Sequence, residues 1–109
     1  VATMDSEAGI KATLSDFGCL HLFDYAVGYD SGFGSKPGPG MVLGFCQHTG
    51  LKPEEVMVVG DNTHDLHMGQ SAGAGFNVGV LTGTSTRSEL ITDADLVLDS
   101  IADLRALWA

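Results

Sequence analysis

Two aspartates that follow an apolar run are the residues whose types and spacing most directly suggest chemistry. The stretch VMVVGDNTHD (56–65) has the pattern of a buried strand, with Gly60 allowing a sharp turn, Asp61 at the tip and Asp65 four residues later. Two carboxylates held close together repel unless a cation or a shared proton lies between them. Proteins hold Mg²⁺ with one or two carboxylates plus water and phosphate. Asp61 and Asp65 are therefore candidate metal ligands, the alternative being that Asp61 only caps the next helix.

Two further polar residues lie at an expected strand end or in a loop. Lys36, in the Gly- and Pro-rich stretch SGFGSKPGPG (31–40), can neutralise carboxylates and contact an anionic substrate; alternatively it is a solvated loop lysine. Thr3 follows a strand-like start and precedes a helix N-terminus, where a hydroxyl and backbone N–H groups can bind phosphate. It can equally do no more than turn the chain. Ligands bind beyond the carboxyl ends of parallel strands, so we expect both residues to meet the acid pair there.

The elements that must position these residues alternate between short apolar runs and helical patterns, which indicates a parallel α/β sheet. We expect strands at 25–30, 56–59, 76–81 and 96–98, and helices at 6–17, 41–49, 63–72 and from Ser100 onward, with one possible helical turn within 82–90. The strand at 56–59 is apolar throughout, as expected for burial on both faces. In the last helix we expect Ile101, Leu104 and Trp108 to face inward.

The composition limits the possible partners. With 109 residues, 44% of them hydrophobic, the chain is long and apolar enough for one packed domain. Its 14 acids and 5 bases give a net charge of −9, which argues against nucleic acid or an anionic membrane as the main partner. Cys19 and Cys46 lack a CxxC spacing, so we expect reduced thiols and a cytoplasmic protein. The sequence contains no apolar run of about 20 residues and no signal-peptide pattern.

Taken in order, the threonine, the lysine and the acid pair resemble three motifs of the haloacid dehalogenase superfamily, in the style of its phosphoglycolate-phosphatase-like members. VAT resembles the second motif, KPGPGM the third and VVGDNTHD the fourth, and MGQSAGAGFNVGVLTG downstream is also similar. The resemblance covers essentially the whole chain. It implies a Rossmann-like three-layer α/β sandwich with a mostly parallel sheet that is incomplete at its N-terminal side. We expect residues 1–109 to be the C-terminal part of such a hydrolase core, without a cap domain.

The resemblance also implies a mechanism, in which Mg²⁺ assists hydrolysis of a small phosphorylated metabolite through an aspartyl-phosphate. Asp61 would coordinate Mg²⁺ directly, and Asp65 would assist through the water shell of the ion or through the loop. Lys36 would hold together the negative charges of nucleophile and substrate. Thr3 and the Met4 N–H would bind the transferring phosphoryl group. Met4 replaces the asparagine common at that position, which changes a side-chain contact but keeps the backbone donor.

The nucleophilic aspartate of the family's DxDGT-type motif is not found within residues 1–109. DAD (93–95) precedes an apolar run instead of following one, and VLDSI (97–101) lacks a second acid. We therefore expect the isolated chain to be inactive. In the family, the strand that bears the nucleophile lies between the strands ending at Thr3 and Asp61, so without it two sheet edges would be exposed. Self-association, pairing with another polypeptide or a missing N-terminal segment of a longer protein would cover them.

Other functions remain open from the residues alone. Receiver domains of response regulators use similar groups around Mg²⁺, but their acids come before the threonine and lysine, and here they come after. A catalytically silent interaction or metal-binding fragment of the same fold is the main alternative, because the nucleophile is lacking. Dehalogenase chemistry leaves the acid pair unexplained, since it needs no Mg²⁺. His64 and His67 have a spacing compatible with a metal pair, but we interpret them as loop and helix-surface residues.

Overall fold

The computed structural model describes residues 1–107, in which α-helices, short 3₁₀ helices and strands alternate. Their order is α1 (Glu7–Asp16), η1 (Leu20–Leu22), α2 (Gly40–Thr49), η2 (Pro53–Glu55), β1 (Met57–Gly60), α3 (Thr63–Ala72), β2 (Phe76–Val80), α4 (Arg87–Leu90), β3 (Leu96–Leu98) and η3 (Ile101–Leu107). The predicted α/β class is confirmed, and strands and helices alternate from β1 onward.

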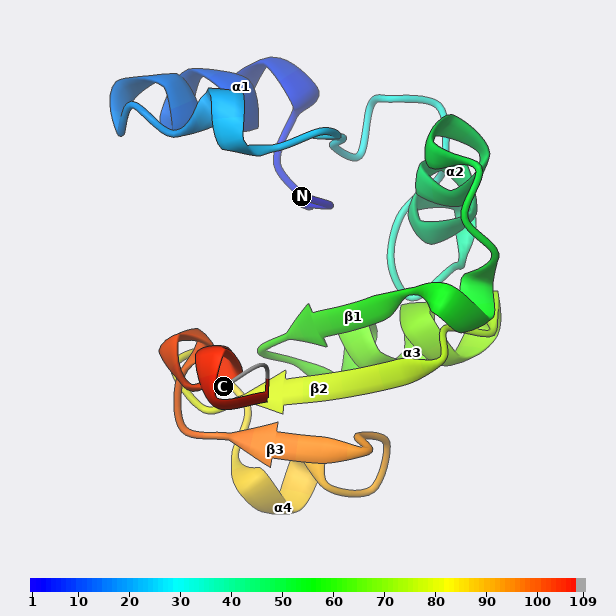
Figure 1. The fold of residues 1–109 in the computed structure, drawn as a ribbon, viewed down its shortest axis with the longest axis vertical. Helices are drawn as coiled ribbons and strands as arrows, with labels where there is room; N and C mark the ends of the chain where they lie inside the picture. Colours follow the sequence, from blue (N-terminus) through cyan, green and yellow to red (C-terminus); the bar gives the residue numbers. More distant parts are fainter. Residues whose placement is uncertain (108–109) are drawn as a thin grey trace.

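The three strands form one parallel sheet in the order β1-β2-β3 (Figure 1). Gly60 at the end of β1 is in register with Gly79 of β2, and Val80 is in register with Leu98 of β3. The carboxyl ends of the strands therefore lie along one edge of the sheet, as predicted for the site. Helix α3 connects β1 to β2 and packs against both strands, and it also contacts α2 and α4.

Helix α3 matches its predicted range because its end signals are local in sequence. The Asn62 side chain accepts a hydrogen bond from the Asp65 N–H at 3.2 Å, and Asp65 in turn accepts from the Asn62 N–H, which forms a capping box. At the other end, Gly73 adopts a left-handed conformation (φ +80°) that ends the helix. The predicted ranges of α2, β2 and β3 are also confirmed within a residue or so at each end, and α4 is the helical turn expected within 82–90.

The core lies between α2, α3 and β1. Its buried members come from all three elements, together with one residue that precedes α2: Val27, Met41, Val42, Cys46, Val58, Met68 and Ala72. Cys46 is buried and Cys19 is half-buried, and both are free thiols. The longest helices of residues 1–107 have ten residues each, which is too short to cross a bilayer.

The predicted strand at 25–30 is wrong. Only one residue pair, Ala2 and Val27, forms an isolated parallel bridge, fixed by hydrogen bonds from Thr3 N–H to the Val27 carbonyl and from Val27 N–H to the Val1 carbonyl, both at 3.0 Å. A strand needs a partner of matching length, and Figure 1 shows this segment apart from β1. Helix α1 beside it contains no buried residue.

The end of the described chain also differs from expectation. Residues 101–107 form a 3₁₀ helix in place of an α-helix, with the Asp103 carboxylate accepting from the Ser100 N–H at 3.2 Å. Ile101 is 61% exposed, so the prediction that it faces inward is wrong, and Leu104 is half-buried. Trp108 lies outside the described residues. A 3₁₀ helix places residues i and i+3 one above the other, so it presents a narrower face than the expected α-helix.

Candidate active site

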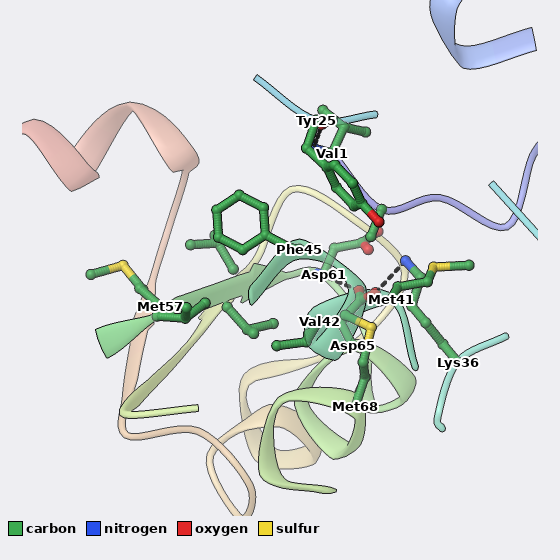
Figure 2. A pocket seen from close by; sticks show the side chains of 14 residues that line it. Val1, Tyr25, Lys36, Met41, Val42, Phe45, Met57, Asp61, Asp65 and Met68 are labelled. Atoms are coloured by element: carbon green, nitrogen blue, oxygen red, sulfur yellow. Dashed lines mark hydrogen bonds and ion pairs between the residues drawn. The ribbon is translucent and has the colours of Figure 1, made fainter. Parts of the chain in front are cut away.

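A cleft of about 420 Å³ opens along the free side of β1 (Figure 2). Strand β1, helix α2 and the N-terminal residues Val1 and Ala2 contribute to its walls, which are mainly apolar. Lys36, Asp61 and Asp65 are its charged members. Met57 and Val59 line the cleft and are only half-buried, so the expectation that β1 is covered on both faces is wrong. The cleft thus combines the half-buried face of β1 with three charged groups.

Lys36 and Asp65 form a buried ion pair at one end of the cleft. The Lys36 Nζ donates to the Asp65 Oδ1 at 2.6 Å, and the two side chains are 12% and 7% exposed. Breaking such a pair leaves an uncompensated charge with little solvent to stabilise it, so each partner fixes the other. The ammonium has three N–H donors and this bond uses one of them. The lysine is therefore a positioned cation and not a solvated loop residue.

Asp65 is committed to the protein through both of its oxygens. Its Oδ2 accepts from the backbone N–H groups of Asp61 at 3.1 Å and of Asn62 at 3.3 Å, while Oδ1 accepts from Lys36. Gly60 makes room for this arrangement, because a Cβ there would overlap the Asp65 side chain. Gly60 does not have a positive φ. Glycine is therefore needed at this position to leave room for the Asp65 side chain, and not for the sharp turn that we expected.

Asp61 has a different environment. Its side chain lines the cleft, and within residues 1–107 its carboxylate takes part in none of the hydrogen bonds or ion pairs of the structure. A free carboxylate at the end of a parallel strand, beside a lysine, provides one oxygen ligand of the kind that Mg²⁺ prefers. Residues 1–107 contain no cluster of three or more potential metal ligands, so the donors fit part of such a site and water or phosphate would have to supply the rest.

Thr3 and Met4 are not among the residues that line this cleft, although Val1 and Ala2 are. The Thr3 hydroxyl accepts a hydrogen bond from the Asp5 N–H at 3.1 Å, and Met4 is 51% exposed. The structure therefore brings together three of the predicted site residues, namely Lys36, Asp61 and Asp65. The two candidate phosphate-binding residues, Thr3 and Met4, lie outside the cleft, on the segment that follows the wall residues Val1 and Ala2.

Two residues at the site were not singled out from the sequence. Tyr25 lines the cleft, its hydroxyl is buried without a hydrogen-bond partner among the described residues, and burial raises the pKa of this phenol, with a smaller contribution from Glu7. Gly83, in the loop after β2, lies directly against the Asp61 side chain. The only feature of the sequence that could have pointed to Gly83 is its position in the loop just after β2, the strand next to β1. His67 pairs with Asp93 at 2.9 Å, consistent with a helix-surface residue.

Comparisons with known proteins agree on one family. A family model described as haloacid dehalogenase-like hydrolase matches residues 1–78. A pyrophosphatase of Halalkalibacterium halodurans is 36% identical over 107 residues, which is 95% of this chain and 48% of that protein. A phosphoglycolate phosphatase of Pasteurella multocida is 30% identical over 105 residues, which is 95% of this chain and 46% of that protein. The chain thus spans about half the length of the curated relatives it matches.

Solved structures have the same fold, and this chain again covers about half of each of them. A predicted phosphoglycolate phosphatase from Haemophilus somnus 129pt has a TM-score of 0.81 at 29% identity, over 91% of this chain and 44% of that one. A haloacid dehalogenase family hydrolase from Deinococcus radiodurans R1, solved with bound phosphate and sodium, has a TM-score of 0.85 at 25% identity, over 99% of this chain and 50% of that one. The Rossmann-like fold predicted for the chain is that of these hydrolases.

Proposed function

Since the chain belongs to the haloacid dehalogenase-like hydrolase family, we propose that it forms one side of a Mg²⁺-dependent phosphatase site for a small phosphorylated metabolite. The observation that carries the proposal is the Lys36–Asp65 pair, which has little solvent access, in the same cleft as Asp61, whose carboxylate has no partner within the described residues, at the carboxyl edge of a parallel sheet. The bound phosphate in the related Deinococcus radiodurans structure supports an anionic substrate. We infer that the substrate is a phosphomonoester.

The three charged residues of the cleft are given distinct roles in this proposal. Asp61 would hold Mg²⁺ directly, because among the three its carboxylate is the one without a hydrogen-bond or ion-pair partner in residues 1–107. Asp65 would act through the loop, holding Lys36 and the backbone at Asp61 in place. The remaining N–H donors of the lysine would face the negative charge of nucleophile and substrate. Bound Mg²⁺ would supply neutralisation of the charge on the transferring phosphoryl group.

The nucleophile in this proposal is an aspartate outside residues 1–109. Its carboxylate would attack phosphorus as the bond to the substrate oxygen breaks, and water would then release phosphate from the aspartyl-phosphate. We place this aspartate on a strand between β1 and the segment at Ala2, because within residues 1–107 β1 has a free edge and Ala2 is bridged to Val27 alone. Thr3 and the Met4 N–H would bind the phosphoryl group from the far side of that strand.

A second candidate function follows from the missing nucleophile. In this second function, the chain would bind a metal ion or a partner without catalysing a reaction. Such binding needs only Asp61 and the edge of β1 that is free within residues 1–107. The two candidates differ in whether an anion binds together with the metal. Phosphate should bind to the chain only in the presence of Mg²⁺ if the site belongs to a phosphatase, and a silent metal site has no such requirement.

The test uses the 109-residue chain and its Asp61→Asn variant. We expect Mn²⁺, as a spectroscopic substitute for Mg²⁺, to bind the wild type and to bind Asp61→Asn at least tenfold more weakly in a calorimetric titration. Asp99→Asn is the matched control, because it removes the same charge at a side chain that is 83% exposed. Equal affinity of wild type and Asp61→Asn would refute the assignment of the metal to Asp61.

Two further measurements address the phosphatase assignment itself. Inorganic phosphate should broaden more in ³¹P spectra with the chain and Mn²⁺ together than with the same concentration of Mn²⁺ alone, and this difference should become smaller in Lys36→Met. The chain alone should not hydrolyse p-nitrophenyl phosphate with Mg²⁺. Turnover that is lost in Asp61→Asn would show that residues 1–109 contain their own nucleophile, and would overturn that part of the proposal.

A further inference from the structure

Gly83 lies where a side chain cannot be accommodated without moving Asp61. A Cβ built on Gly83 would overlap three atoms of the Asp61 side chain, namely Oδ2, Cγ and Cβ. Gly83 does not have a positive φ, so its backbone conformation is open to any L-residue. Glycine is therefore required here for space and not for conformation.

The overlap cannot be relieved by the Asp61 side chain alone. Rotation about χ1 would move Oδ2 and Cγ away, but the Cβ is bonded to the backbone of the residue and stays where it is. The loop that carries Gly83 is short and fixed at both ends. The Leu81 N–H donates to the Leu98 carbonyl at 3.0 Å, and Thr86 begins α4 with a capping box. An alanine would therefore displace the Asp61 carboxylate, the loop, or both.

We propose that Gly83 is a positioning residue that sets the place of the Asp61 carboxylate by lying against it. This inference rests on the proposed function, because it takes Asp61 as the metal ligand. Gly60 has the same relation to Asp65, so each carboxylate of the acid pair lies against a glycine. β1 and β2 are neighbours with Gly60 and Gly79 in register, which brings the two loops to the same edge.

The sharpest test compares two glycine-to-alanine variants of the 109-residue chain. Gly83→Ala would overlap Asp61, whereas Gly75→Ala would overlap backbone atoms of Glu54, which does not line the cleft and lies before β1, at the opposite edge of the sheet from Asp61. Both should lower the urea midpoint of unfolding. Mn²⁺ affinity should fall at least tenfold in Gly83→Ala and stay within twofold of wild type in Gly75→Ala. A role limited to stability would leave the Mn²⁺ affinity of both folded variants unchanged.

A double-mutant cycle tests the contact independently of the metal. Asp61→Gly removes all three overlapping atoms, so the loss of stability caused by Gly83→Ala should largely disappear in the Asp61→Gly background. An undiminished loss in that background would overturn the inference.

The outcomes separate the two proposals. If the wild type binds Mn²⁺ and Gly83→Ala binds it equally well, the positioning role is wrong and the proposed metal site stands. If the wild type binds no Mn²⁺, the proposed metal site is wrong, and the positioning role falls with it even if the cycle shows the contact.

Discussion

The sheet half of the chain (residues 56–98) and its N-terminal segment (residues 1–34) contribute opposite walls of the same cleft, yet they are built differently. In the sheet half, α3 buries five of its ten residues and three parallel strands share backbone hydrogen bonds. In the N-terminal segment, α1 buries no residue and a single bridge joins Ala2 to Val27. The acid pair and the loop after β2 belong to the better-packed half, and Asp65 is held in addition by Lys36 from the loop before α2.

The largest test of this difference replaces one apolar side chain in each half. Leu66 on α3 is fully buried, so Leu66→Ala should lower the free energy of unfolding by about 2–5 kcal/mol. Phe17 at the end of α1 is 81% exposed, so Phe17→Ala should change it by less than about 0.5 kcal/mol. Urea denaturation of the 109-residue chain measures both. If the two variants lost comparable free energy of unfolding, Phe17 and the N-terminal segment around it would be buried in solution.

The next effect separates the two acids of the site. Asp65→Asn leaves Lys36 with little solvent and no carboxylate, which should cost about 2 kcal/mol of stability. Asp61→Asn removes a charge that has no partner in the part of the chain that the structure describes, and it should change stability by less than about 0.5 kcal/mol. The same urea titrations measure both variants. A larger loss for Asp61→Asn than for Asp65→Asn would show that the roles of the two acids are reversed.

The same difference between the halves explains which sequence predictions succeeded. Helix α3 could be predicted because its signals, Asn62 at the start and Gly73 at the end, act within a few residues. The segment at 25–30 has strand-like composition, but a strand forms only with a partner, and in residues 1–107 its only β-bridge is the one between Val27 and Ala2. Signals within a few residues were thus enough to predict the helices and the strands next to them. The lack of a strand partner for the segment at 25–30 could not be predicted from the composition of that segment.

The site was predictable in its residue types and less so in its geometry. The sequence singled out Lys36 and Asp65, which lie 29 residues apart and pair at 2.6 Å. It did not indicate that the pairing would occupy Asp65 fully while Asp61 stays free. The roles of Gly60 and Gly83 were also out of reach, because each depends on which side chain approaches it in three dimensions.

A smaller effect compares one side-chain pair from each half. His67 on α3 is hydrogen-bonded to Asp93 before β3, a contact that is an ion pair only when the imidazole is protonated, and their side chains are 44% and 21% exposed. Lys11 pairs with Glu7 within α1, at 48% and 39% exposure. Exposed pairs contribute little to stability, and the pair between elements should have the larger coupling energy because its Asp93 carboxylate is the least exposed of the four side chains. Double-mutant cycles in urea measure both, and equal coupling energies would contradict this ranking.

The smallest predicted effect concerns how the N-terminal segment responds to acid. The Ser31 hydroxyl donates to Glu7 at 2.6 Å, and this bond, followed by the bond and charge of Lys11, lowers the pKa of the Glu7 carboxyl from 4.5. A lowered pKa in the folded state means that the stabilisation is present above pH 4.5 and is lost as the pH falls through the folded value. Glu7→Gln and Ser31→Ala should therefore both reduce the loss of stability between pH 5 and pH 3, and the double variant should do no more than Glu7→Gln. Urea midpoints across that range measure the slope, and an unchanged slope in Glu7→Gln would show that the Glu7–Ser31 link does not hold α1 to the loop in solution.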